Sequence, residues 1–295
     1  MSSLKALRSR IKSVNNTKKI TATMKMVAAA KLRRARDTAE KTRAYAEALA
    51  QVLGRLATAQ SGEEASLLLT GRATVKTVRL VVFATDRGLC GAFNTNILRA
   101  VAEFVKQQQA AGRTVQLQPI GNKAVDGLAA RGLAKYLVHP QRDVTRQLGP
   151  RLAQAMAAGL VDDFTQGQCD AVYVLYNRFI SALVQKPTQL GLLPAANAVT
   201  AAAEVATTAA ALEYEPSAPE VLADVLPRFL AVQLLQAGQE SQASEQGARM
   251  TAMDNATRNA GGMVKKLSLV YNRTRQANIT RELIEIISGA EAIRG

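Results

Sequence analysis

The sequence predicts an α/β protein with long terminal helices: an antiparallel coiled coil of the N- and C-terminal helices, with a central Rossmann-like α/β domain between them. Residues 1–58 and roughly 216–293 each have the pattern of one long helix, and the stretch between them alternates strand-like with helix-like segments. Such alternation is typical of a parallel-type sheet with crossover helices. We therefore expect a coiled-coil helix over 1–58, an α/β domain over 75–190 and a second coiled-coil helix over 212–295.

The first helix is defined by a 3-4 spacing of mostly apolar residues, as a coiled-coil seam requires. No Pro or Gly occurs before Gly54, so nothing interrupts it. At 1.5 Å per residue it would be about 80 Å long, too long to be buried in a globule of this size. The seam positions are Leu4, Leu7, Ile11, Val14, Lys18, Thr21, Lys25, Ala28, Leu32, Ala35, Ala39, Thr42, Ala46, Leu49, Leu53 and Leu56.

Polar residues at three of these positions interrupt the apolar stripe. Around Lys18, Thr21 and Lys25 the apolar residues move by one position. The shifted stripe consists of Ile20, Met24 and Val27. This pattern predicts that the seam changes phase in this part of the helix.

The C-terminal helix should begin near Pro219 or Pro227, because proline is accepted in a first helical turn and is costly inside. Its seam continues through small residues that let a partner helix approach closely. The end of the helix differs, because large apolar residues cover nearly its whole circumference at Leu283, Ile284, Ile286 and Ile287. A helix of this kind is surrounded by something. We expect other subunits to cover it.

The positive charge is concentrated in the first helix. The net charge is +15, and residues 1–58 hold 14 Lys and Arg against three acidic residues, whereas residues 212–295 are nearly neutral. A basic helix indicates an acidic partner: nucleic acid, anionic lipid or a carboxylate-rich protein surface.

Strands alternate with helices in the central domain. Glycine and proline mark several of the boundaries between these segments. The expected helices cover 94–109, 122–132 and 144–165. The expected strands are Val78–Phe83, Thr114–Ile120, Tyr136–Val138, Ala171–Tyr176 and Phe179–Lys186.

The central domain carries no recognisable catalytic, cofactor or metal motif. The turn after the first strand is neither G-x-G-x-x-G nor a Walker loop, so we expect Asp86, Arg87 and Gly88 to shape a strand-to-helix corner. Cys90 is expected to be a buried small side chain, because the single histidine, His139, would have to act as its base. One histidine and two distant cysteines do not fit a zinc site. We expect no cofactor and no catalytic residue.

Cellular location follows from the N-terminus and from the cysteines. Cys90 and Cys169 provide no disulfide framework and suit a reducing compartment. The first residues lead into an amphipathic helix rather than an apolar signal core, which argues against export. The first 36 residues are basic and acid-free, like a mitochondrial presequence, but their pattern continues unbroken to residue 58.

Three segments together resemble the gamma subunit of F-type ATP synthases, the rotating central stalk. They are Ile11–Arg33 (IKSVNNTKKITATMKMVAAAKLR), Thr85–Gly91 (TDRGLCG), and Ala243–Met250 (ASEQGARM) running on to Tyr271–Ala290 (YNRTRQANITRELIEIISGA). Each alone is moderately specific, and all three in this order are strongly specific. The resemblance covers the whole chain, although residues 59–74 and 140–215 carry little recognisable pattern.

The resemblance implies a non-catalytic shaft. Its helices would rise through a ring of alpha and beta subunits, with the α/β domain on a membrane ring of c subunits and an epsilon subunit in the same stalk. Proton flow would turn ring and shaft together and drive the beta sites through ATP synthesis or hydrolysis. The complex would lie on the cytoplasmic face of the bacterial inner membrane or, as the alternative, on the matrix side of the mitochondrial inner membrane.

The resemblance also implies roles for individual residues. Arg275 and Gln276 correspond to the pair that hydrogen-bonds a beta-subunit loop, with Thr280 and Glu282 further along. Met24 and Arg249 correspond to the region that meets the acidic lever of the beta subunit. The implied contacts with the membrane ring are Lys31, Arg33, Arg34, Tyr214 and Glu215. The regulatory cysteine insertion of chloroplast members is missing, so redox switching is not expected.

The main alternative function is a basic coiled coil that binds nucleic acid, supported by an isoelectric point of about 10.2. Such binding would weaken steeply with salt. Against it, Met24, Met26 and Val27 lie among the lysines, and the chain has no aromatic stacking platform. The third alternative is an enzyme that uses the α/β domain, but the sequence of that domain shows no catalytic site.

Overall fold

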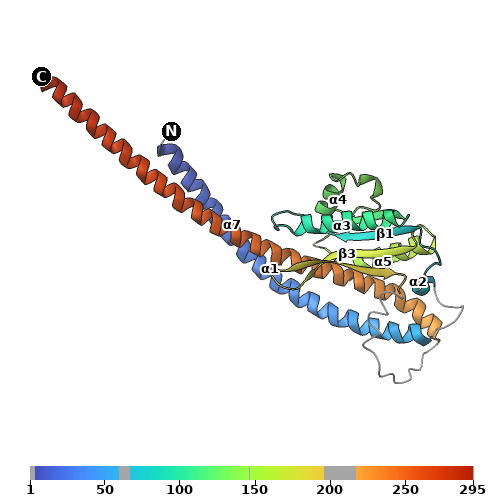
Figure 1. Cartoon of the computed structure of the whole chain (residues 1–295). Helices are drawn as coiled ribbons and strands as arrows, with labels where there is room; N and C mark the ends of the chain where they lie inside the picture. Colours follow the sequence, from blue (N-terminus) through green and yellow to red (C-terminus); the bar gives the residue numbers. More distant parts are fainter. Residues whose placement is uncertain (1–3, 60–66, 146, 196–216, 295) are drawn as a thin grey trace. The chain divides into compact units, whose positions relative to one another are not determined.

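The computed structural model describes residues 4–59, 67–145, 147–195 and 217–294. The chain forms two compact units, one made of Met1–Ala28 with Met250–Gly295 and the other of Ala29–Arg249. Two long helices contribute to both units: α1 (Leu4–Ala59) and α7 (Ala218–Arg294), drawn blue and orange to red in Figure 1. The two long helices expected from the sequence are therefore present.

Helix α7 begins where the first proline predicted it. The Ser217 hydroxyl accepts a hydrogen bond from the Glu220 N–H (3.4 Å), and the Ser217 carbonyl accepts one from Val221 (3.0 Å). Serine at this position satisfies N–H groups that the first turn leaves without partners. Pro227, the other predicted start, lies inside the helix.

A four-stranded mixed sheet forms the centre of the unit Ala29–Arg249. Its order is β2-β1-β3-β4, with β1 (Thr77–Phe83) parallel to β2 (Thr114–Ile120) and β3 (Ala171–Phe179), and β4 (Gln185–Leu193) antiparallel to β3. Apolar residues fill nearly all of β1 and the inner part of β3, as expected of strands that are covered on both faces.

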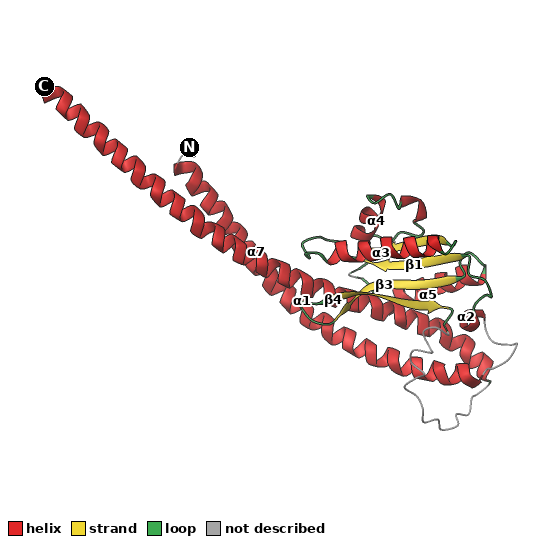
Figure 2. Ribbon diagram, viewed as in Figure 1, coloured by secondary structure: helices red, strands yellow, loops and turns green. Residues whose placement is uncertain are grey.

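Helices cover both faces of this sheet (Figure 2). One face packs on α3 (Phe93–Ala110) and α4 (Asn122–Ala129). The other packs on α5 (Pro150–Thr165) and on the parts of α1 and α7 that belong to this unit. In β1 the side chains alternate accordingly, with Leu80 in the first core and Val81 in the second. A short helix, α2 (Leu67–Thr70), adds Leu69 to the second core.

Three predicted elements of the central domain are wrong in type or extent. Tyr136–Val138 is not a strand: a 3₁₀ turn, η1 (Ala134–Tyr136), leads to a single bridge between Leu137 and Leu117. The chain then turns at His139, whose φ is 44°. The helix expected over 144–165 begins only at Pro150, after Gly149, because proline fits the first turn.

The third of these elements, the predicted strand Phe179–Lys186, has the wrong bounds. Strand β3 continues to Phe179, the chain turns, and β4 covers Gln185–Leu193 with Pro187 inside it, paired with Asn177. Strand β4 lies at the edge of the sheet, where a proline removes no hydrogen bond that the ladder needs. Pro187 therefore does not end the strand.

In the unit made of the chain ends, α1 and α7 run antiparallel. Arg8 hydrogen-bonds Tyr271 (2.7 Å), while Lys25, later in α1, pairs with Asp254, earlier in α7 (2.6 Å). Leu7 and Ala28 of α1 are buried in this unit, as are Met253 and Ala260 of α7. The antiparallel pairing predicted for the terminal helices is confirmed.

The predicted phase change of the seam is wrong. Thr21 is buried and keeps the original spacing, whereas Ile20 and Val27 are 60% and 50% exposed. Thr257 donates a hydrogen bond to the Thr21 hydroxyl (2.8 Å), which donates to the Lys18 carbonyl (3.1 Å). Because these hydroxyls satisfy each other, a polar layer is accepted in the seam and no shift is needed.

Helix α7 also contains an 18-residue window with a mean hydropathy of 1.3, of which 44% is buried within the protein. Length and composition alone would allow such a window to cross a membrane. A packed core helix meets the same criteria, so the window does not by itself indicate a membrane span.

Candidate partner-contact surfaces

Four large apolar side chains near the end of α7 are left uncovered by the chain. Leu283, Ile284, Ile286 and Ile287 are 53%, 58%, 66% and 65% exposed. Covering one of them with a partner would stabilise a complex by roughly 1–2 kcal/mol, because each is already partly shielded by its own helix. A cluster of this kind marks a protein interaction site.

Four polar residues precede this apolar end on the same helix. Arg275, Gln276, Thr280 and Glu282 are all exposed. Their spacing places Glu282 two turns beyond Arg275 on one face, and Thr280 one turn beyond Gln276 on a neighbouring face. All four side chains are therefore accessible to a partner that approaches the end of α7.

Met24 lies on an exposed surface of α1 that is both apolar and basic. Its side chain is half-buried, while Ile20, Met26 and Val27 are exposed among lysines. Lys25 reaches across to Asp254, and the hydrogen bond that it donates lowers the pKa of that carboxyl group. Apolar contact and positive charge on one surface suit an acidic protein partner.

Arg249 is engaged within the unit Ala29–Arg249. Its guanidinium pairs with Glu245 one turn earlier (2.5 Å) and donates a hydrogen bond to the backbone carbonyl of Gly88 (3.2 Å). The side chains of Arg249 and Glu245 are each 13% exposed. Little of the Arg249 side chain is therefore left for a direct contact with another subunit.

The loop that Arg249 contacts is the corner predicted after the first strand. One Asp86 carboxylate oxygen accepts the N–H of Asn122 (3.1 Å), and the other accepts the N–H of Thr145 (3.2 Å) and its hydroxyl. Cys90 is 2% exposed, and burial raises the pKa of its thiol. The predictions of a structural Asp86 and of a buried Cys90 are confirmed.

Three of the residues expected to meet a membrane ring lie on α1. Lys31, Arg33 and Arg34 are exposed. Tyr214 and Glu215 lie outside the described residues.

Sequence reasoning missed a buried ion pair between the long helices. Glu240 of α7 is 1% exposed and pairs with Arg43 of α1 (2.8 Å). Nearby, burial raises the pKa of Tyr176 to about 12, and the negative charge of Glu240 contributes. Glu240 stands among glutamines and small residues (QAGQESQAS), a pattern that does not distinguish a buried carboxylate from an exposed one.

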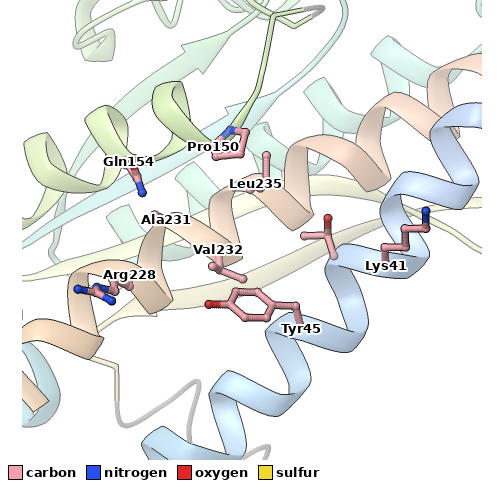
Figure 3. Close-up of a pocket in the computed structure, with 9 residues that line it drawn as sticks. Lys41, Tyr45, Pro150, Gln154, Arg228, Ala231, Val232 and Leu235 are labelled. Atoms are coloured by element: carbon pink, nitrogen blue, oxygen red, sulfur yellow. The ribbon is translucent and has the colours of Figure 1, made fainter. Parts of the chain in front are cut away.

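Figure 3 shows a pocket of about 510 Å³ between α1, α5 and α7. Lys41 and Arg228 lie at its rim, and the hydroxyl end of Tyr45 points into the space between the helices. The other lining residues are Thr42, Pro150, Gln154, Ala231, Val232 and Leu235. None of the described lining residues is a His, Cys, Asp or Glu. Among the residues that the structure describes, no three such side chains gather to hold a metal ion.

Two long antiparallel helices with exposed contact surfaces, joined to a small α/β unit, define a protein that works by contact with other subunits. The model of the ATP synthase family matches residues 3–293. The chain is 50% identical over 294 residues to the ATP synthase gamma chain of Methylobacterium sp. (strain 4-46) and 50% identical over 300 residues to that of Rhodospirillum rubrum. Each match covers 99% of this chain and 100% of the relative.

Two solved structures have the same fold. One is a chain of the central stalk and c-ring of the Tetrahymena thermophila mitochondrial ATP synthase, with a TM-score of 0.62 and 26% identity over 80% of this chain and 99% of that one. The other is a chain of the Euglena gracilis mitochondrial ATP synthase in an OSCP/F1/c-ring assembly, with a TM-score of 0.67 and 22% identity over 98% and 94% of the two chains. At 22% identity, the Euglena gracilis structure shows only that the fold is shared.

The chain belongs to the family of ATP synthase gamma chains. It is therefore a subunit of a membrane-associated complex. None of these findings supports the alternative of a basic coiled coil that binds nucleic acid.

Proposed function

We propose that this chain is the central rotary shaft of an ATP synthase, and that it couples proton-driven rotation of a membrane ring to the conformational cycle of the catalytic beta subunits. One observation carries the proposal. The end of α7 exposes four large apolar side chains that require a cover, and in the proposed assembly the ring of alpha and beta subunits would provide it.

The apolar end of α7 would turn inside an apolar sleeve of that ring. Hydrophobic contact is non-directional, so its strength changes little as one surface slides past another. Directional hydrogen bonds would have to break at each step and would hold the shaft in preferred positions.

Arg275, Gln276, Thr280 and Glu282 would make the polar contacts with a loop of a beta subunit. The planar guanidinium of Arg275 remains charged and can bind a carboxylate through two parallel hydrogen bonds. The exposure of all four residues supports this assignment. Such a contact would be strong at one angle of the shaft and absent at the others.

Met24 and the exposed residues around it would meet the acidic lever of the beta subunit. We assign Arg249 to the same region, with a part played through α7 rather than by direct contact, because its guanidinium already has two partners within the chain.

The α/β domain, over 75–190, would act as one piece between the coiled-coil parts at 1–58 and 212–295, near the ring of c subunits and the epsilon subunit. Lys31, Arg33 and Arg34, together with Tyr214 and Glu215, would lie near polar loops of the ring. The chain would be non-catalytic, and the complex would lie on the cytoplasmic face of a bacterial inner membrane.

Co-expression with the alpha and beta subunits of the same source tests this function. We expect the wild-type chain to co-purify in fixed stoichiometry and to raise ATPase activity. A double variant, Leu283→Asp with Ile286→Asp, should stay folded because both residues are exposed, yet should fail to assemble normally. The matched control, Ile286→Leu, should assemble. Failure of the wild-type chain to associate would overturn the proposal.

A further inference from the structure

Small residues let α7 lie closely against the end of strand β3. Ser244 is fully buried, and its hydroxyl donates a hydrogen bond to the carbonyl of Asn177 (2.8 Å). One turn later, a Cβ added at Gly247 would lie 3.3 Å from the Cα of Ala182, in the turn between β3 and β4. Helix α7 thus lies against the sheet through close contacts at small residues.

A second set of contacts holds α7 to the loop between β1 and α3. Cys90 and Phe93 form a small buried cluster with Ala248. The next residue of α7, Arg249, donates a hydrogen bond to the carbonyl of Gly88 in the same loop. This loop is therefore attached to the helix by an apolar cluster and by a charged donor beside it.

The geometry of Arg249 fits a fastening role. Its Nη1 atom pairs with Glu245 on its own helix, which fixes the direction of the guanidinium, and its Nη2 atom reaches Gly88 across the gap. The loop itself is rigid at its start, because Asp86 is tied to backbone N–H groups of Asn122 and Thr145. A hydrogen bond from a charged donor, here Arg249 on α7, to a carbonyl on a fixed loop is stronger than a hydrogen bond between two neutral groups.

Arg249 also occupies a special place along α7. It is the last residue of the unit Ala29–Arg249, and from Met250 onwards the helix belongs to the unit made of the chain ends. The contact surfaces at 275–287 all lie beyond this point. Any torque that passes between the α/β unit and those surfaces along α7 must cross this residue.

We propose that Arg249 is a latch that fastens α7 to the loop Thr85–Gly91, and that it positions the helix for torque transfer instead of binding another subunit itself. The part about torque rests on the proposed rotary function; the latch itself does not. Arg249 is then a positioning residue: its effect on ATP turnover passes through the attachment of α7 to the loop.

The two buried cysteines provide a direct test of the latch. Cys90 belongs to the attached loop and packs against Phe93 and Ala248, whereas Cys169 lies in a different core cluster, and both are buried. In the full-length chain, we expect Arg249→Gln to raise the rate of maleimide labelling at Cys90 by about tenfold or more through local opening. Labelling of Cys169, measured in the same sample by peptide mass spectrometry, should not change.

Two further variants sharpen the comparison. Arg249→Lys keeps the charge and can still pair with Glu245, but it lacks the planar fork that reaches two acceptors at once, so we expect an intermediate rate at Cys90. Arg228→Gln removes another i,i+4 ion pair of α7, the exposed one with Asp224, and should leave Cys90 protected. An unchanged Cys90 rate in Arg249→Gln would overturn the latch, as would equal increases at Cys90 and Cys169, which would indicate general loss of fold.

Coupling in the assembled complex tests the second half of the proposal. In membrane vesicles carrying the whole complex, Arg249→Gln should lower ATP-driven proton pumping several-fold more than ATP hydrolysis. Equal loss of both activities, with Cys90 opened, would overturn the role in torque transfer and leave the latch standing. If the wild-type chain fails to assemble, the rotary function falls, while the labelling result still decides the latch.

Discussion

Arg43 and Glu240 join the two long helices by a buried ion pair. The Glu240 carboxylate oxygen Oε1 lies 2.8 Å from Nη2 and 3.1 Å from Nε of Arg43, so the guanidinium grips one oxygen with two donors. The other oxygen, Oε2, is buried with no hydrogen-bond partner among the described residues. Removing the cationic partner of a buried carboxylate is strongly destabilising, because a buried charge is left without compensation.

The first prediction concerns this pair. Arg43→Met should lower the free energy of unfolding by about 3 kcal/mol, because it leaves Glu240 buried without a counter-charge. Urea unfolding of the full-length chain, followed by circular dichroism, measures the change. Arg228→Met, which breaks an exposed pair, is the control and should cost less than about 0.5 kcal/mol. Adding Glu240→Met to Arg43→Met should recover most of the loss; no recovery would show that Arg43 acts through packing alone.

Asp170 should make stability depend on acid pH. Burial alone would raise its pKa, but hydrogen bonds from the Thr77 and Lys76 N–H groups, with the nearby Arg72, lower the pKa below the ordinary 3.8. A carboxyl group with a lowered native pKa stabilises the fold above its unfolded pKa, and the benefit is lost as pH falls through the native value. Asp170→Asn should therefore cost about 1–3 kcal/mol at neutral pH.

Unfolding of the Asp170→Asn variant and the wild type, measured from pH 7 down to below the lowered native pKa, tests this. The two stability curves should converge once the pH has fallen below 3.8 and through the native pKa of Asp170. A constant gap across this range would mean that Asp170 contributes through shape rather than charge.

Gly121 should not accept a side chain. It has a φ of 97°, and an added Cβ would lie 2.6 Å from the Ala84 carbonyl oxygen. We expect Gly121→Ala to lower the free energy of unfolding by roughly 2–4 kcal/mol, combining backbone strain with the clash. Gly112 also has a positive φ (72°), but it has open space around it, so Gly112→Ala should cost only about 1 kcal/mol. Thermal unfolding of both variants compares them, and equal shifts would exclude the clash as the cause.

Arg275→Ala should impair coupled ATP turnover and leave the chain folded. Its side chain is exposed, so its loss removes no internal packing, while the proposed charge-assisted contact with a beta subunit is worth about tenfold in turnover. ATPase activity and circular dichroism of the purified complex measure the two effects. Arg273→Ala, an exposed arginine on a different side of the same helix, should keep normal turnover. Loss of fold in Arg275→Ala would show that a structural residue had been mistaken for a contact.

Local sequence patterns predicted most of the fold. The long helices were predictable because their apolar seams persist over many turns, and in α1 no proline or glycine occurs before Gly54; β1 was predictable because it is a short apolar run, and β2 because Gly121 marks its end. The errors arose where tertiary pairing decides. Pro187 was taken as the end of a strand, and only its place on an edge strand makes it acceptable inside one.

Side-chain partners were the least predictable part. In the sequence, Thr21 looks like a break in the apolar seam. The structure shows that Thr257 lies opposite it and donates a hydrogen bond to its hydroxyl. Likewise, nothing in the local sequence around Arg249 shows that it reaches Gly88, because the two are 161 residues apart in the chain. The exposed apolar residues at 283–287 could be predicted, because a helix that is apolar on several sides needs a partner regardless of its own fold.

The central claim, that the chain turns as a shaft, is tested most directly by single-molecule rotation. Both native cysteines are buried, so Lys106→Cys on the exposed side of α3 provides a specific site for a bead on the α/β unit. In a surface-fixed complex with alpha and beta subunits, ATP should drive stepwise rotation of the bead in one direction. A complex that hydrolyses ATP at a normal rate while the bead only fluctuates about one position would contradict the account.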